Sequence, residues 1–414
     1  MKFQTPKGTR DYWGDSFYIR QNLANKILSV TQTYGFKQAL TPMFESLELL
    51  TKDAGAVEEQ IYRITDKAGR EFGLKSDITP PITRIVANEG RSYPKPIKIS
   101  CFDRVYRYER PQKGRYREIS QINAEMFGVR SARSDAEIIR CFYDCYQKIG
   151  LPNVQITIGY RPLLESFVSS LTSVENILPI IRLIDKKDKI GIDEFNRQLV
   201  VFKISKTSIS KINKFVSLRG SVKEVIAQTK KLFSDSLGNK KFLNNISRIF
   251  KELSDYGVSS NCKLDLGLAR GSDYYTGIIF EVRYPGLESF GSIGGGGRYD
   301  NLVEFYGGPK TPAVGFSIGI NRVMDLLASL DIKDSNLPNL DYFIANESSP
   351  CKLATIIRNK GFSVEIDLNN SSLSDQVALG KKRGARFIII VKRKIRLLEV
   401  STGQEKPITI NDIV

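Results

Sequence analysis

Residues 105–128, with the sequence VYRYERPQKGRYREISQINAEMFG, carry the strongest structural signal in this chain. Together with the residues before them they form two strand-like stretches, 96–109 and 117–129, joined by the charged turn RPQKGRY. This pattern predicts an antiparallel hairpin with a polar tip. Because residues of equal parity share one face of a strand, we expect a polar face formed by Arg107, Glu109, Gln121, Asn123 and Glu125. Such a face fits either solvated cross-strand ion pairs or a site for a ligand that carries phosphate and amine groups.

A second stretch, LDLGLARGSDYYTGIIFE (residues 264–281), places Arg270 between Gly267 and Gly271. An arginine flanked by glycines can approach a phosphate closely and stabilise charge as it develops. The alternative is a tight turn with tyrosines that belong to the core.

The glycine run GGGGRYDNLVEFYGG (residues 294–308) has too many glycines for a simple hairpin and could cradle a phosphate. No GKS or GKT follows it, and no GxGxxG precedes a helix. The sequence therefore contains neither a P-loop nor a dinucleotide fingerprint.

The composition excludes much of enzyme chemistry, because the 414 residues include no histidine. Ser-His-Asp and Cys-His arrangements, the HExxH zinc helix and histidine-ligated metals all require an imidazole. Carboxylates, arginines, hydroxyls and the backbone remain as catalytic groups. The five cysteines are scattered without a CxxC pair, so we expect neither a disulfide framework nor a fixed protein metal site.

The net charge of +17 fits either a polyanionic partner or a lysine-rich genome with a solvated surface. Residues 161–258 hold 18 Lys and Arg against 10 Asp and Glu, and residues 337–414 hold 12 against 8. Both segments are candidate nucleic-acid surfaces.

The length predicts two or three domains. A first helix should begin with Asp15 as its cap and end at Gly35, followed by a short strand broken by Pro42 and a second helix from Leu47 to Leu50. Residues 161–258 have helical periodicity and resemble an inserted module. A polar linker near 331–339 precedes alternating strands and helices, which predict a small parallel α/β domain. No apolar stretch of about 18 residues and no apolar signal core occur, so we expect a cytoplasmic protein without a membrane segment.

These motifs together resemble the histidyl-tRNA synthetases, a family of class II aminoacyl-tRNA synthetases, over essentially the whole chain. TPMFE (41–45) is similar to motif 1 of the class, residues 105–128 to motif 2 and AVGFSIGINRVMDLL (313–327) to motif 3. ARGSDYYTGIIFE (269–281) resembles a segment specific to the histidine family.

The resemblance implies an α+β fold, in which a class II antiparallel-sheet catalytic domain (1–330) carries a helical insertion (about 161–258) and is followed by an anticodon-binding α/β domain (337–414). It also implies ATP-dependent activation of L-histidine to histidyl-adenylate and transfer to the 3′ end of histidine tRNA, with Mg²⁺, by a homodimer. Adenylate formation by an ionised carboxylate needs positive charge and positioning more than a general base.

Site residues follow from the matching motif positions. The resemblance implies catalytic roles for Arg107 and Arg270. Histidine would be bound by Asp77, Thr79, Arg107, Gln121, Glu125, Arg270, Tyr274 and Tyr275. ATP would be bound by Arg107, Glu109, Ile119 and Arg322, and the tRNA acceptor end would meet Arg110 and Gln112.

Two of the motifs depart from the family pattern. Ile119 and Ser120 stand where an aromatic residue and a histidine are usual, and Asn321 stands where an acid is common. The alternative function is that of the regulatory paralogue, which does not aminoacylate and activates ATP phosphoribosyltransferase in histidine biosynthesis. That paralogue lacks the C-terminal domain and tends to lose motif residues, whereas this chain keeps both.

Overall fold

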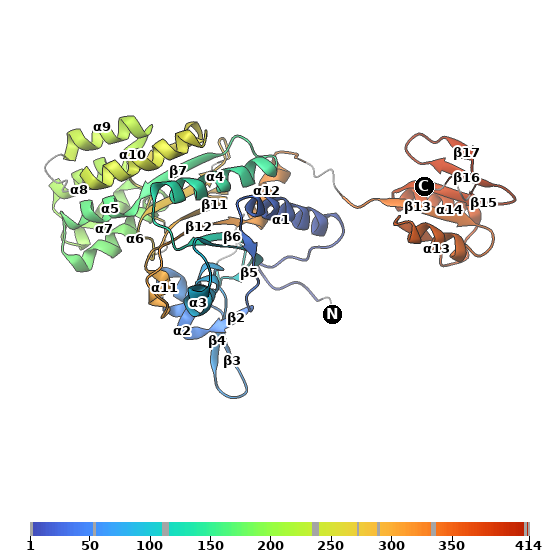
Figure 1. Cartoon of the computed structure of the whole chain (residues 1–414), viewed down its shortest axis with the longest axis horizontal. Coiled ribbons are helices and arrows are strands. Elements are labelled where there is room, and N and C mark those ends of the chain that lie inside the picture. Colours follow the sequence, from blue (N-terminus) through green and yellow to red (C-terminus); the bar gives the residue numbers. More distant parts are fainter. Residues whose placement is uncertain are drawn as a thin grey trace. The chain divides into compact units, whose positions relative to one another are not determined.

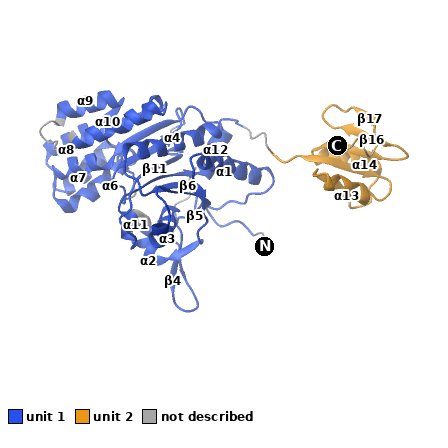
Figure 2. Cartoon of the chain, viewed as in Figure 1, with its two compact units in different colours: residues 1–333 blue, residues 334–414 orange. Residues whose placement is uncertain are grey.

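The computed structural model describes residues 3–52, 55–109, 116–233, 240–270, 273–287, 290–332, 337–409 and 412. The chain divides into two compact units, Met1–Lys333 and Asp334–Val414 (Figures 1 and 2). Among the described residues, no helix is long and apolar enough to cross a membrane.

The described part of the first unit is built on a nine-stranded sheet with the order β1-β5-β6-β12-β11-β10-β7-β9-β8. Its strands are β1 (Lys37–Gln38), β5 (Ile97–Tyr106), β6 (Glu118–Phe127), β7 (Gln155–Tyr160), β8 (Arg219–Gly220), β9 (Cys262–Asp265), β10 (Ile278–Arg283), β11 (Gly294–Arg298) and β12 (Ala313–Gly319). All neighbours are antiparallel except β1 with β5 and β7 with β9. The predicted hairpin is therefore confirmed as β5 and β6, and Asp103 lies opposite Gln121 in its register.

Helices cover both faces of this sheet. On one face, α1 (Asp15–Thr33), α4 (Ala132–Lys148) and α12 (Ile320–Ser329) pack against even-numbered residues of β6 such as Ile122 and Ala124. On the other face, α3 (Thr79–Glu89) and α11 (Leu302–Phe305) pack against Phe127. The odd-numbered polar residues of β6 thus face α3.

A small three-stranded sheet lies beside α3. It consists of β2 (Phe44–Ser46), β4 (Glu71–Leu74) and β3 (Arg63–Thr65), accompanied by α2 (Leu47–Thr51) and by the 3-10 helices at Gly55–Gln60 and Gly90–Ser92. The break at Pro42 and the helix near Leu47–Leu50 are confirmed. The prediction that Asp15 caps α1 is wrong, because Gly14 occupies the cap position and Asp15 is the first helical residue.

The predicted helical character of residues 161–258 is also observed. The module contains α5 (Arg161–Ser169), α6 (Val174–Ile190), α7 (Ile192–Val201), α8 (Lys206–Val216), α9 (Val222–Phe233), α10 (Lys240–Asp255) and a 3-10 helix at Ser259–Asn261. Its buried side chains, among them Phe195 and Leu199, belong to the same apolar cluster as Phe316 of β12. The module therefore shares a core with the sheet.

The second unit has a five-stranded sheet in its described residues, in the order β14-β13-β15-β16-β17. It comprises β13 (Leu340–Asn346), α13 (Cys351–Asn359), β14 (Val364–Ile366), α14 (Leu373–Lys382), β15 (Ala385–Val391), β16 (Ile395–Glu399) and β17 (Glu405–Pro407). The first three strands are parallel as predicted, but β16 and β17 are antiparallel. The turn between β15 and β16 is too short for a parallel crossover, which needs a dozen or more residues.

Candidate active site

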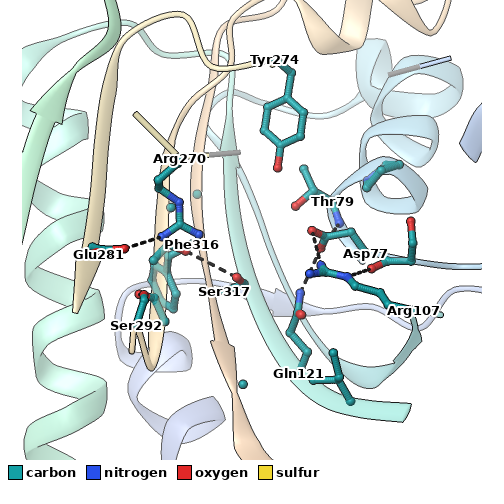
Figure 3. A pocket seen from close by; sticks show the side chains of 18 of the residues that line it. Asp77, Thr79, Arg107, Gln121, Arg270, Tyr274, Glu281, Ser292, Phe316 and Ser317 are labelled. Carbon is teal, nitrogen blue, oxygen red and sulfur yellow. Dashed lines mark hydrogen bonds and ion pairs between the residues drawn. The ribbon is translucent and has the colours of Figure 1, made fainter. Parts of the chain in front are cut away.

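A pocket of about 450 Å³ opens on the α3 side of the first unit's sheet (Figure 3). Every predicted histidine or ATP residue lines it: Asp77, Thr79, Arg107, Glu109, Ile119, Gln121, Glu125, Arg270, Tyr274, Tyr275 and Arg322. Arg110 and Gln112, predicted to meet the tRNA acceptor end, lie outside the described residues.

One wall of the pocket is a chain of hydrogen bonds along β6. Gln121 donates from Nε2 to Asp77 Oδ1 at 3.0 Å and to Asn123 Oδ1 at 2.7 Å. Asn123 donates from Nδ2 to Thr79 Oγ1 and to Glu125 Oε1, both at 3.0 Å. Each amide therefore has a fixed orientation, and the wall presents a defined pattern of donors and acceptors.

Asp77 lies just before helix α3, and its carboxylate accepts hydrogen bonds from a backbone N–H, an amide and a guanidinium. Its Oδ1 accepts the backbone N–H of Ile78 at 2.7 Å and the amide of Gln121. Arg107 donates from Nη2 to Asp77 Oδ2 at 3.3 Å and from Nε to the carbonyl of Ser76 at 2.8 Å. The carboxylate is thus held in place in the pocket wall, and the guanidinium of Arg107 lies beside it (Figure 3).

Glu125 is the deepest carboxyl group of the site and is 1% exposed. Thr79 Oγ1 donates to its Oε1 at 2.7 Å, and the hydroxyl of Tyr299 donates to its Oε2. Burial raises the pKa of Glu125 to about 7, although these hydrogen bonds favour the charged form. The group can therefore change protonation state near neutral pH.

Arg270 lies across the pocket from Arg107 (Figure 3). Its backbone has a φ of 47°, in the left-handed region that side-chain-bearing residues rarely adopt. Its Nη1 donates to the carbonyl of Phe280 at 3.3 Å and lies 3.9 Å from Glu281 Oε2. The guanidinium is therefore directed over the sheet.

Glycines leave the space that these side chains fill. A Cβ atom on Gly295 would stand 1.9 Å from Arg270 Nη1, and one on Gly315 would stand 1.6 Å from Glu125 Oε2. The glycine run is accordingly a central strand, β11, whose backbone pairs with β10 and β12. The run therefore begins with a strand, and its glycines Gly294, Gly295 and Gly296 also line the pocket. That it could cradle a phosphate stays a prediction.

The two departures from the family pattern lie in different environments. The side chain of Ile119 lines the pocket, whereas Ser120 accepts a hydrogen bond from Arg20 Nε of α1 at 2.9 Å. Asn321 accepts the backbone N–H of Ser120 at 2.7 Å and donates to the hydroxyl of Tyr12. Ile119 and Asn321 both line the pocket, so either can alter its shape directly.

Sequence reasoning missed several residues of the pocket wall, among them Tyr299, Glu281 and Asp185. Tyr299 directly follows β11, and Asp185 belongs to α6 of the helical module. The only sequence signal for Tyr299 was its place within the glycine run 294–308. Within the described residues, no group of three or more histidine, cysteine, aspartate or glutamate side chains could hold a metal ion.

The arrangement suits an anionic and polar ligand. Two arginines stand on opposite sides of the pocket, and carboxylates and amides line the wall between α3 and β6. Positive groups fixed in this way can stabilise charge that develops on a phosphate between them.

A mainly antiparallel sheet that presents such a pocket on one face is the catalytic architecture of the class II aminoacyl-tRNA synthetases. Residues 8–323 match the family model described as histidyl-tRNA synthetase. The chain belongs to the histidyl-tRNA synthetase family.

Similar proteins extend over the full chain. A protein of Pyrococcus horikoshii named histidine–tRNA ligase is 35% identical over 423 residues, which cover 99% of this chain and 97% of the relative. One of the same name from Methanocaldococcus jannaschii is 34% identical, with coverage of 100% and 99%.

Solved structures agree with this. The crystal structure of histidyl-tRNA synthetase from Nostoc sp. PCC 7120 has a TM-score of 0.83 at 25% identity, covering 100% of this chain and 99% of that one. A Bacillus halodurans protein described as an ATP phosphoribosyltransferase regulatory subunit/histidyl-tRNA synthetase has a TM-score of 0.79 at 23% identity, with coverage of 94% and 98%. It shows the same fold.

Proposed function

We propose that this chain is a histidine–tRNA ligase, which activates L-histidine with ATP and transfers it to the 3′ end of histidine tRNA. The observation that carries the proposal is that all eleven predicted histidine and ATP residues that lie in the described part of the chain line one pocket. The chain retains Arg107 and Arg270, which can stabilise the charge on the α-phosphate of ATP. This argues against the regulatory alternative, because a protein that does not form an adenylate does not need these two groups.

Histidine binding follows from the polar wall. Asp77 and Thr79 lie where they can accept hydrogen bonds from the α-ammonium group of histidine, and Arg107 can bind the carboxylate of histidine. A neutral imidazole has one donor and one acceptor, so the deeper end of the pocket must offer both. Glu125 can accept, and the hydroxyls of Tyr274 and Tyr275 can donate. Analogues without ring nitrogens would leave these buried groups unpaired and would be rejected.

Activation then needs no general base. An oxygen of the histidine carboxylate attacks the α-phosphorus of ATP, the bond to the bridging oxygen breaks, and pyrophosphate leaves with the electron pair. Arg107 and Arg270, on opposite sides of the pocket, stabilise the charge on the α-phosphate. The ribose hydroxyl of the tRNA afterwards attacks the activated carbonyl and displaces AMP.

The adenine of ATP would lie between Ile119 and Arg322, whose Nη1 donates to the carbonyl of Ser292. Glu109 and Glu281 offer carboxylate oxygens at the pocket wall. Mg²⁺ prefers such oxygens and retains several waters beside substrate phosphates, so these two residues would hold it with ATP, where it neutralises phosphate charge.

The tRNA would bind to two basic regions. The module carries exposed cations on several helices, including Lys206, Lys211, Lys214, Lys223, Lys230, Lys231, Lys241, Arg248 and Lys251. The second unit would bind the anticodon. Arg110 and Gln112 would meet the acceptor end.

A homodimer is supported by exposed apolar residues at the segment similar to motif 1. Leu40, Met43 and Phe44 are 77%, 53% and 50% exposed beside the short edge strand β1. Exposed apolar groups of this kind mark association surfaces. We propose a cytoplasmic location for such an enzyme.

A charging assay tests the proposal. Purified protein, ATP, Mg²⁺, labelled histidine and histidine tRNA should yield acid-precipitable label that depends on ATP and on the cognate tRNA. Absence of charging, together with activation of an ATP phosphoribosyltransferase on mixing, would instead establish the regulatory alternative.

A further inference from the structure

We propose that helix α6 positions the loop that carries Arg270, through an ion pair between Arg182 and Asp273. The inference rests on the proposed function, because it makes these two residues positioning residues for histidine activation. Neither residue belongs to the predicted site.

The ion pair joins parts of the chain that are 91 residues apart. Arg182 Nε lies 3.3 Å from Asp273 Oδ1 and 3.2 Å from Oδ2, and Nη2 also contacts Oδ2. Such a two-pronged contact fixes orientation as well as distance. The Asp273 side chain is 17% exposed, so water competes only partly for the carboxylate.

A second residue of α6 lines the same pocket as Arg270. Asp185 follows Arg182 by three positions, so both lie on one side of the helix. Asp185 lines the pocket together with Arg270, and the two charges interact. Helix α6 therefore acts on both Arg270 and Asp273.

The loop requires such support. The left-handed backbone of Arg270 is unfavourable for a residue with a side chain, and it persists only where surrounding contacts fix it. The contacts of its guanidinium with Phe280 and Glu281 hold one side. On the other side, the ion pair of Asp273 with Arg182 attaches the loop to α6, directly before Tyr274 and Tyr275.

Helix α6 is itself immobilised. Ile180, Ile181, Leu183 and Ile184 are buried in the apolar cluster that includes Phe316 of the sheet. The ion pair therefore ties the loop to an element that is fixed relative to the pocket.

The test compares Arg182→Ala, Asp273→Ala and the double variant in ATP–pyrophosphate exchange, after titration of active sites. We expect each single change to raise KM for histidine and lower kcat, with kcat/KM falling roughly tenfold to a hundredfold, as small misplacements of reacting groups do. The double variant should resemble either single one, because both remove the same contact. Arg182→Lys should restore part of the activity.

Because the rates are normalised to titrated active sites, loss of folded protein alone would leave both kcat and KM unchanged. Arg197→Ala is the matched control, since Arg197 forms an exposed ion pair with Glu194 at 2.6 Å on α7 of the same module. We expect that variant to match the wild type. An Arg182→Ala variant that also matches it, or single effects that add in the double variant, would overturn the proposal.

Limited trypsin cleavage after Arg270 provides a readout without catalysis. Cleavage there should accelerate in Arg182→Ala and not in Arg197→Ala, and unchanged cleavage would overturn the positioning role. Absence of exchange in the wild type would contradict the proposed function separately.

Discussion

The guanidinium of Arg270 lies against the backbone of Gly295, so closely that a Cβ atom on that glycine would stand 1.9 Å from Nη1. The same atom would stand 2.5 Å from the carbonyl of Phe280, which accepts the hydrogen bond from Arg270. A missing side chain on β11 thus determines where the positive charge is placed.

We expect Gly295→Ala to reproduce the loss caused by Arg270→Ala. Removing the guanidinium should lower the rate of adenylate formation by roughly 10²–10³, the typical cost of losing a preorganised charge in a transition state. The methyl group added in Gly295→Ala displaces the same guanidinium, so the kcat of this variant should fall by a comparable factor. Presteady-state measurement of adenylate formation checks this, and a near wild-type rate in Gly295→Ala would show that the close contact is unimportant.

Gly315→Ala should affect histidine recognition instead. Its Cβ would stand 1.6 Å from Glu125 Oε2, where Tyr299 donates its hydrogen bond. The carboxylate must then leave its partners, so we predict a rise of roughly tenfold or more in KM for histidine, equal to about 1.4 kcal/mol or more of binding, with a smaller change in KM for ATP. Steady-state kinetics with histidine and ATP varied in turn distinguishes the effect of Gly315→Ala from that of Gly295→Ala. Equal changes in KM for histidine and KM for ATP would refute a local effect of Gly315→Ala.

Glu125 should make the stability of the protein depend on pH. Burial raises the pKa of Glu125 from its ordinary value of 4.5 to about 7, so between these values the folded chain holds a proton that the unfolded chain has lost. Stability therefore falls as the pH rises through this window, by about 3 kcal/mol in total at about 1.4 kcal/mol per pKa unit.

Glu125→Gln removes this contribution. The stability of the variant relative to the wild type should therefore increase from pH 5 to pH 8 in thermal denaturation without ligands. Asp135, whose pKa burial raises to about 6, contributes in the same direction to both proteins and cancels in the comparison. A difference that does not change with pH would mean that Glu125 titrates normally.

The affinity for tRNA should depend strongly on salt. Exposed lysines of the module and the net charge of +17 predict release of counterions on binding. Filter binding at 50 and 200 mM salt should show a loss of affinity of about a thousandfold or more if six or more phosphates are contacted. Affinity that is independent of salt would argue against a phosphate-dominated interface.

Local patterns allowed much of the site to be predicted. The alternation along 117–129 placed Gln121, Asn123 and Glu125 on one face, because strand parity is a property of neighbouring residues. The motif resemblance supplied Asp77 and Thr79, which meet that face only through the packing of α3 on the sheet.

The residues that were missed depend on contacts between distant segments. Tyr299 meets Glu125 across 174 positions, and the glycines before it carry no apolar pattern that would reveal a buried strand. Asp185 belongs to a helix with a polar face that is indistinguishable in sequence from a solvated one. The antiparallel end of the second sheet was missed because strand order is not encoded in the periodicity of single strands.

Histidine-dependent exchange of labelled pyrophosphate into ATP tests the central claim most directly, since it reports adenylate formation without tRNA. We predict that purified protein with ATP and Mg²⁺ exchanges pyrophosphate when histidine is added, and that Arg270→Ala loses nearly all of this activity while remaining folded. Exchange that is absent in the wild type, or equally rapid without histidine, would contradict the account.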